Sequence, residues 1–249
     1  MKKIVVCCIS FTLALVGCNK LHESVVDNHI VVTQRGGKTI AYSPESGINI
    51  LYEDGYAFKD LNRNGSIDVY EDWRRNASER AENLASQMSI EEIAGLMLYS
   101  KHMAVPHISS SDPMKYTYGG KSFADSGADT TDLSDNQKVA LKDDNLRHIL
   151  VTKVSSPSAA ARWNNNLQAF AESLPLGIPA NNSSDPRNET RATDEFNEGS
   201  GGQASRWPPP LGLPASFDPA VVRAFGEVVS AEYRALGTAT ALSPKADIY

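Results

Sequence analysis

Two stretches decide the fold: LGIPANNSSDPRN at residues 176–188 and SFDPAVVRAFGEVVSAEYRALGTATALSPKADIY at residues 216–249. The first is a short apolar run that ends in polar residues, which predicts a strand. The second begins as an amphipathic helix and continues into another strand. A strand, a crossover helix and a second strand form a β/α repeat, and in such repeats chemistry collects where the strands end. Asp185 and Asp247 stand at those positions and are the first candidates for a site.

The helix in this repeat has clear start and stop signals. Asp218 is a favoured N-cap residue, Pro219 suits the first helical position, and Gly237 suits the residue after the last turn. Upstream, residues 148–152 form an apolar strand candidate, and Ser156-Pro157 predicts the start of another helix. Strands and helices therefore alternate from residue 148 onward, which favours a parallel α/β architecture.

The helix predicted after Ser156-Pro157 has a core stripe at helical spacing, formed by Trp163, Leu167 and Phe170. Two shorter helices are predicted earlier, with N-caps at Asn76 and Ser89, each followed three residues later by Glu. Their apolar residues predict buried faces: Leu84, Met88, Ile93, Leu96 and Met97. Residues 99–144 lack periodicity and are rich in Ser, Asp and Gly, which predicts a long irregular segment.

The N-terminus predicts a signal peptide over residues 1–17. Lys2 and Lys3 precede an apolar run that is too short to span a bilayer. The cleavage region LVGC, ending at Cys18, resembles the bacterial lipobox, in which the cysteine becomes the lipid-carrying first mature residue. Because Asn19 rather than Asp follows, an outer-membrane lipoprotein of a Gram-negative bacterium is expected, facing the periplasm or the surface. The alternative is an ordinary signal peptide with a chance cysteine.

The other two cysteines of the chain, Cys7 and Cys8, fall within the predicted signal peptide. With Cys18 lipidated, the mature protein would have no thiol for a disulfide, a thiolate metal site or a nucleophile. The net charge of −6 and the absence of a basic stripe argue against nucleic acid as a partner. No organic cofactor is expected.

A calcium loop is predicted within residues 58–75, after a tether and small β extension at residues 18–57 with a turn at Gly36-Gly37. The stretch DLNRNGSIDVYE fills each position of the twelve-residue EF-hand pattern, including the glycine at the sharp bend. The expected Ca²⁺ ligands are Asp60, Asn62, Asn64, Ser66 through its carbonyl, Asp68 and Glu71. A single copy indicates a structural ion rather than a sensor. The alternative is an Asn/Gly-rich surface loop.

Three segments together resemble glycoside hydrolase family 3, the family of β-glucosidases and related exo-acting enzymes. They are ERAENLASQMSIEEIAGLML (79–98), WNNNLQAFAESLPLGIP (163–179) and the stretch from RWPPPLGLPASFDP to the end (206–249). The resemblance covers residues 76–249. It implies the N-terminal part of a (β/α)₈ TIM-like barrel, with a site on the loops that follow the strands.

The resemblance also implies retaining hydrolysis of β-linked glucosides or oligosaccharides. Asp185 falls where the family has a carboxylate that binds sugar hydroxyls. Asp247 matches an acidic position near the pocket floor, and Arg187 and Asn188 lie beside Asp185, where they would orient it or touch substrate. A carboxylate suits such a role because its two oxygens can accept hydrogen bonds from neighbouring hydroxyls. Read without the resemblance, Asp185 could equally be a turn or cap residue.

The sequence departs from the family after residue 249, where the family carries further substrate-binding residues, the nucleophilic Asp and the acid/base. We therefore expect an N-terminal fragment of a longer enzyme, with about three of the eight strands and no catalytic residue of its own, inactive by itself. The alternative is a non-catalytic, calcium-stapled lipoprotein module that binds glycan or a partner protein.

Overall fold

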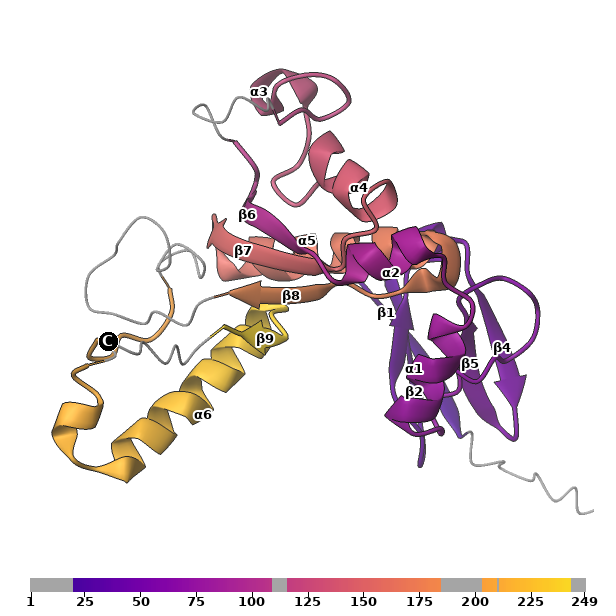
Figure 1. Ribbon diagram of the computed structural model, residues 1–249, viewed down its shortest axis with the longest axis horizontal. Coiled ribbons are helices and arrows are strands. Elements are labelled where there is room, and N and C mark those ends of the chain that lie inside the picture. Colours follow the sequence, from indigo (N-terminus) through magenta and orange to yellow (C-terminus); the bar gives the residue numbers. More distant parts are fainter. Residues whose placement is uncertain (1–19, 109–115, 185–202, 210, 243–249) are drawn as a thin grey trace, which may run out of the picture.

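The computed structural model describes residues 20–108, 116–184, 203–209 and 211–242. Figure 1 shows three parts in chain order: an N-terminal β part, a pair of short helices, and a parallel sheet with its helices. The β part lies at one end of the parallel sheet, and helix α6 extends from the opposite end.

The N-terminal β part consists of a three-stranded antiparallel sheet and a separate hairpin. The sheet has strands β1 (Leu21–Val26), β2 (His29–Gln34) and β3 (Ile40–Tyr42), and the hairpin has strands β4 (Asn49–Glu53) and β5 (Tyr56–Asp60). Gly36 has a φ of 78° in the turn between β2 and β3, so the predicted turn is confirmed. Phe58 is buried and stacks on Trp73 with ring centroids 5.2 Å apart. This small core continues directly into the loop that begins at Asp60.

The two short helices α1 (Ala77–Ala85) and α2 (Ile90–Leu96) begin at the predicted caps. The side chains of Asn76 and Ser89 accept hydrogen bonds from the backbone of the third helical residue, and Ser89 forms a complete capping box with Glu92. The predicted buried faces are wrong, because α1 buries no residue and Met97 is 82% exposed. Only Gly95 of α2 is buried, against the turn at Asp144 and Asn145.

The central sheet has four strands in sequence order, with every neighbouring pair parallel. They are β6 (Tyr99–Val105), β7 (His148–Val154), β8 (Asn181–Ser184) and β9 (Thr240–Ala241). The expectation of an irregular segment over residues 99–144 is wrong, because this segment contains β6 and the short helices α3 (Phe123–Ser126) and α4 (Asp135–Lys142). Strand β6 pairs along its length with β7, a partner far away in sequence that periodicity does not reveal.

Two long helices pack with this sheet. Helix α5 (Pro157–Ser173) begins at Ser156, and α6 (Pro219–Leu236) begins at Asp218 and ends at Gly237, as predicted. Three short 3₁₀ turns flank them and the β part: η1 (Pro44–Ser46), η2 (Pro175–Gly177) and η4 (Pro214–Ser216).

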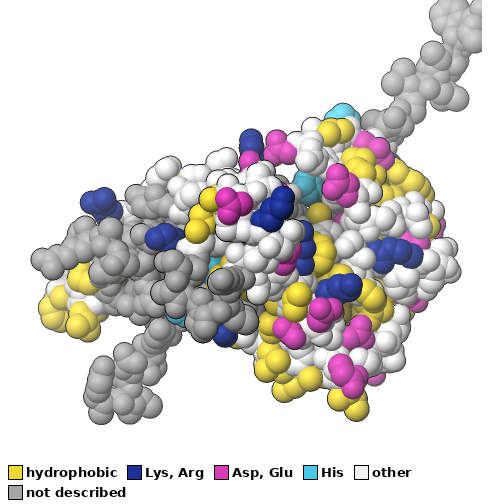
Figure 2. All heavy atoms as spheres, turned by 90° about the horizontal axis from the view of Figure 1, so that it is seen from above, with side chains coloured by type: hydrophobic (Ala, Val, Ile, Leu, Met, Phe, Trp, Pro, Cys, Tyr) yellow, Lys and Arg dark blue, Asp and Glu magenta, His cyan; other side chains and the backbone are white. Residues whose placement is uncertain are grey.

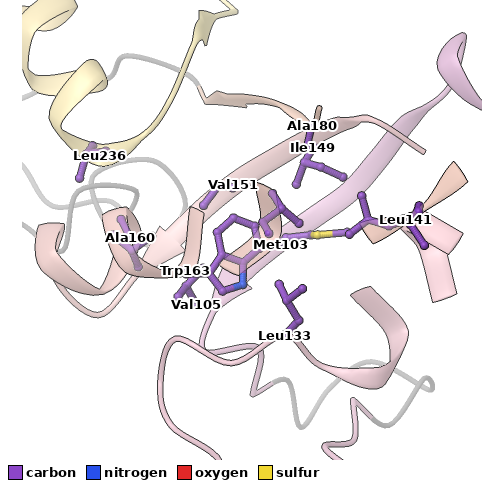
Figure 3. Close-up of a cluster of buried hydrophobic side chains, with 13 residues drawn as sticks. Met103, Val105, Leu133, Leu141, Ile149, Val151, Ala160, Trp163, Ala180 and Leu236 are labelled. Carbon is purple, nitrogen blue, oxygen red and sulfur yellow. The ribbon is translucent and has the colours of Figure 1, made fainter. Parts of the chain in front are cut away.

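The hydrophobic core lies between α5 and the sheet. Trp163 and Leu167 of α5 are fully buried, and Figure 3 shows Trp163 surrounded by side chains from β6, β7 and the segment before α4. Leu236 of α6 joins the same cluster, and Figure 3 shows it near Ala160 of α5. The predicted apolar stripe on α5 therefore packs against the sheet. Phe170, at the edge of the stripe, is only partly buried. Burial of such a side chain stabilises the fold by about 1.5–3 kcal/mol.

The predicted α/β class with a parallel sheet is confirmed, whereas closure into a (β/α)₈ barrel stays a prediction. No helix of the described part is long and apolar enough to cross a membrane.

Candidate functional site

The carboxyl ends of the four parallel strands meet at one edge of the sheet. The backbone N–H of Ser155, after β7, donates to the carbonyl of Val105 at the end of β6 over 2.9 Å. The N–H of Leu242, after β9, donates to the carbonyl of Ser184 at the end of β8 over 3.0 Å. The segments that follow all four strands therefore start side by side. In parallel α/β proteins this edge is where ligands bind.

Strand β8 lies between β7 and β9 and is unusual because its residues are polar and buried. Ser183 is fully buried and donates from Oγ to the carbonyl of Ile149 over 3.1 Å. The amide of Asn182 donates to Oδ1 of Asn164 on α5, and its own Oδ1 is buried without a hydrogen-bond partner. Buried polar groups of this kind are costly when unpaired. Their presence in the middle of the sheet indicates a polar centre immediately before Asp185 in the chain.

The start of β8 is held by side chains from two other elements. Gln168 of α5 forms two hydrogen bonds with the backbone of Ala180, of 2.9 and 3.0 Å. The buried guanidinium of Arg147 donates to the carbonyl of Ile178 over 2.9 Å, and burial lowers the pKa of Arg147. The N–H of Asn181 in turn donates to the carbonyl of Arg147 over 2.7 Å. These contacts fix the start of β8, and the hydrogen bond from the N–H of Leu242 to the carbonyl of Ser184 fixes its end.

The residues predicted to bind sugar lie outside the described residues. These are Asp185, Arg187 and Asp247, and the predicted lipidation site Cys18 and neighbouring Asn188 lie outside them as well. The structure does describe Ser184, which directly precedes Asp185 and is paired with Ala241 of β9. The roles of the three sugar-binding candidates stay predictions.

The predicted calcium loop follows β5 without a break. Asp60 Oδ2 accepts a hydrogen bond from the N–H of Gly65 over 3.1 Å, across the loop. Glu71, at the last loop position, accepts from the N–H groups of Leu61 at 2.6 Å and Asp68 at 3.0 Å. Gly65 has a φ of 78°, the left-handed conformation that favours glycine at a sharp bend. Hydrogen bonds from the loop backbone to the carboxylates of Asp60 and Glu71 therefore close the loop into a ring.

Asparagine side chains fill the interior positions of this loop. Asn62 and Asn64 each donate from Nδ2 to Oδ2 of Asp68, over 2.6 and 2.7 Å. Their Oδ1 atoms accept from the N–H groups two residues further on, those of Asn64 and Ser66. The six predicted ligand residues are thus gathered within one loop. No cluster of three His, Cys, Asp or Glu side chains in the described residues has the geometry of a preformed metal site, so the calcium assignment stays a prediction.

Several cavities lie elsewhere in the described part, and two of them border the N-terminal β part or strand β6. One of about 660 Å³ lies between the N-terminal β part and α5, with polar residues such as Asn28, Glu45 and Asn166 in its wall. Another, of about 480 Å³, runs beside β6 and α4 and is more apolar, with Met103 and Val139 in its wall. None of the cavities found in the described part is lined by residues of the loop from Asp60 to Glu71. On the face shown in Figure 2, acidic and basic side chains are interspersed over the described surface.

Sequence reasoning missed the docking of the loop on the end of α5. Arg63, inside the loop, donates hydrogen bonds to the carbonyl of Glu172, and Lys59, next to the loop, pairs with the carboxylate of Glu172 at the end of α5. No local sequence pattern marks this docking, because the partners are more than a hundred residues apart and the left-handed φ of 60° at Arg63 is visible only in the structure.

Comparison with known proteins relates the chain to β-glucosidases. It is 38% identical over 204 residues to a "Periplasmic beta-glucosidase/beta-xylosidase" of Dickeya chrysanthemi. The aligned residues make up 81% of this chain and 28% of that protein. It is 30% identical over 188 residues to a "Probable beta-glucosidase C" of Aspergillus oryzae, with 75% and 26% covered. It is 32% identical over 193 residues to a "Beta-glucosidase C" of Emericella nidulans, with 76% and 27% covered. No protein-family model matches the chain.

The chain therefore spans little more than a quarter of the length of these relatives. Their names support a relation to β-glucosidase-like glycoside hydrolases, as the sequence resemblance implies. The periplasmic relative from a Gram-negative bacterium is consistent with a periplasmic location.

Proposed function

We propose that this chain is part of a retaining, exo-acting β-glycosidase and supplies a portion of its sugar-binding pocket. The observation that carries the proposal is the buried polar strand β8, fixed at both ends and leading directly into Asp185. The relation to β-glucosidases supports the reaction class. Because the chain spans only part of these relatives, the activity is proposed for the complete protein.

In this proposal Asp185 binds hydroxyls of the sugar that is released, with Arg187 beside it and Asp247 nearer the pocket floor. A carboxylate forms charge-assisted hydrogen bonds with vicinal hydroxyls, and these bonds strengthen as the sugar ring distorts toward the transition state. The nucleophile and the acid/base of retaining hydrolysis would be supplied by residues outside the 249 given in the sequence. These two groups perform the bond cleavage, so the chain alone should not hydrolyse a glycoside.

The test is steady-state hydrolysis of aryl β-glucosides and β-xylosides by the complete enzyme and by its Asp185→Ala variant. We expect the variant to lose about 100-fold or more in kcat/KM, equivalent to a loss of about 3 kcal/mol of transition-state stabilisation. A loss below about threefold would remove Asp185 from the site. Retained glycan binding without any hydrolysis by the complete protein would instead favour a non-catalytic binding module.

We also propose that the mature protein is anchored to the outer membrane through a lipid on Cys18. The support is the short apolar run that ends in LVGC, together with the periplasmic location of one relative. Replacement of Cys18 by Ser should move the protein from the membrane fraction to the soluble periplasmic fraction and abolish labelling by a fatty-acid analogue. Unchanged labelling of Cys18→Ser would contradict the anchor.

A further inference from the structure

We propose that the loop from Asp60 to Glu71 binds one Ca²⁺, and that this loop holds the connection between α5 and β8 in place. The proposal joins a metal site to the strand that leads into the candidate sugar pocket. It does not depend on the glycosidase activity, because both the ion and its effect on β8 can be measured without substrate.

The first argument is uncompensated negative charge. The loop contains three carboxylates, on Asp60, Asp68 and Glu71, and Asp60 and Glu71 are buried. Among the described residues, none of the three forms an ion pair. Burying carboxylates without an opposite charge is unfavourable, so a cation bound in the loop would stabilise its folded form.

The second argument is a buried oxygen without a partner. Asp60 is fully buried, and its Oδ1 accepts no hydrogen bond from any residue that the structure describes. The other oxygen of the same carboxylate already accepts from the N–H of Gly65 across the loop. The carboxylate is thus oriented toward the loop with one oxygen left over, as a first metal ligand would be. A buried carboxylate oxygen without a hydrogen bond is otherwise rare.

The ligand chemistry selects the ion. The groups the loop can offer are carboxylate, amide and carbonyl oxygens, with no nitrogen or sulfur ligand among the predicted set. Hard oxygen ligands in a flexible loop suit Ca²⁺, which accepts six to eight of them, better than Mg²⁺, which demands a tight octahedron. The amide groups of Asn62 and Asn64 now face Asp68. Binding would require their oxygens to turn toward the ion, a rotation within an already closed ring.

The loop also lies where the N-terminal β part contacts the end of α5. The guanidinium of Arg63 donates to the carbonyl of Ser46 over 2.9 Å and to that of Glu172 over 3.1 Å. It forms longer bonds of 3.3–3.4 Å with the carbonyls of Gly47, Leu61 and Leu174. One side chain thereby connects the turn after β3, the loop itself and the end of α5. Arg63 lies at a loop position that supplies no metal ligand, so its role is separate from binding the ion.

Two further contacts tie the loop to the residues before β8. Lys59 pairs with Glu172, whose carboxylate is buried at the end of α5. Leu61 packs so closely against Gly177 that a Cβ at Gly177 would lie 2.9 Å from the Leu61 side chain. Gly177 lies only four residues before Asn181, where β8 begins. A loop that is ordered by its ion would therefore also order the segment from residue 172 to residue 184.

The experiment measures binding and local order together on the full chain, stripped of metal with EGTA. Calorimetric titration with CaCl₂ gives stoichiometry and affinity, with MgCl₂ as the comparison ion. Hydrogen–deuterium exchange with and without Ca²⁺ follows peptides over residues 172–184. For the unmodified chain we expect one Ca²⁺ bound and slower exchange in these peptides, a comparison that needs no variant.

Variants distinguish Ca²⁺ binding by the loop from the effect of the loop on residues 172–184. Asp60→Asn keeps the shape of the side chain but removes its charge, and should weaken Ca²⁺ binding by about 100-fold or more. Asp54→Asn is its matched control, the same change at an exposed turn residue of the neighbouring hairpin, and should leave binding unchanged. Arg63→Asn tolerates the left-handed backbone. It should keep Ca²⁺ affinity within about threefold, as expected for a residue outside the ligand set, but lose the slower exchange over residues 172–184.

The outcomes that overturn the proposal are distinct. No binding at about 1 mM Ca²⁺, the weak end for extracellular calcium modules, would refute the metal site. Binding that leaves exchange over residues 172–184 unchanged, or that slows it equally in Arg63→Asn, would refute the coupling. Neither result bears on the glycosidase proposal, which is tested separately by hydrolysis and by Asp185→Ala.

Discussion

Replacing Gly95 by alanine tests how helix α2 is held against the turn at Asp144 and Asn145. Intrinsic helix propensity favours alanine over glycine by about 1 kcal/mol, so sequence alone predicts that Gly95→Ala stabilises the protein. The structure predicts the opposite. A Cβ at Gly95 would lie 2.5 Å from the Cβ of Asn145 and 2.6 Å from the backbone oxygen of Asp144. Because these neighbours are backbone-linked atoms, they cannot yield by a simple rotation.

The magnitude follows from the two opposing effects. Overpacking of a closed site costs about 1–3 kcal/mol, and close backbone atoms place Gly95 at the upper end of that range. Subtracting a propensity gain of about 1 kcal/mol leaves a net loss of about 2 kcal/mol. Gly226 on α6 is the matched control, because it is helical and exposed and its Cβ would meet nothing within 4 Å. Gly226→Ala should therefore gain about 1 kcal/mol.

The assay is urea unfolding of both variants and the unmodified chain, followed by tryptophan fluorescence. The two variants should differ by about 3 kcal/mol in free energy of unfolding, with opposite signs relative to the unmodified chain. For a chain of this size, thermal midpoints should fall by about 4–8 °C for Gly95→Ala and rise by about 2–4 °C for Gly226→Ala. If both variants stabilise the chain equally, α2 does not rest on the turn at Asp144 and Asn145, and the reasoning fails.

Three further perturbations follow from local contacts. Leu167→Ala removes a fully buried side chain from the core, so urea unfolding should show a loss of about 2–5 kcal/mol. Asp218→Ala removes the N-cap of α6 and should cost about 1 kcal/mol in the same assay, whereas Asp218→Asn should keep most of it. Hydrogen bonds from the N–H of Gly120 and the hydroxyl of Thr117 hold the pKa of Asp135 below its ordinary value of 3.8. The ionised carboxylate of Asp135 therefore stabilises the fold fully above pH 3.8, and this stabilisation is lost as pH falls through the lower folded-state pKa. Asp135→Asn should thus destabilise the chain at about pH 7 and less at about pH 3. An equal effect at both pH values would contradict the lowered pKa.

Features set by neighbours in sequence were predictable. The caps at Asp218 and Ser89 could be read directly, because a capping side chain bonds to backbone only two or three residues away. The stripe on α5 was readable because helical spacing alone places Trp163 and Leu167 on one face. The same locality makes the spacing of the loop from Asp60 to Glu71 recognisable.

Features set by distant partners were not predictable. Strand β6 lies in a stretch without clear periodicity, and it is defined by pairing with β7 about fifty residues later. The apolar residues of α1 and α2 suggested buried faces, but burial depends on what packs against a helix, and no described element covers Met97. Helical pattern indicates that a face could be buried, never what buries it.

The features of the candidate site also separate into those set by neighbours in sequence and those set by distant partners. The polar end of β8, the acidic residue that follows it and the oxygen-rich loop could be recognised from residue types alone, because each is a local pattern. The contacts of Arg63 and Lys59 with the end of α5, more than a hundred residues away, became visible only in the folded chain, as did the loop's position beside the segment before β8. Such contacts depend on how separate elements pack, and local residue patterns carry no record of them.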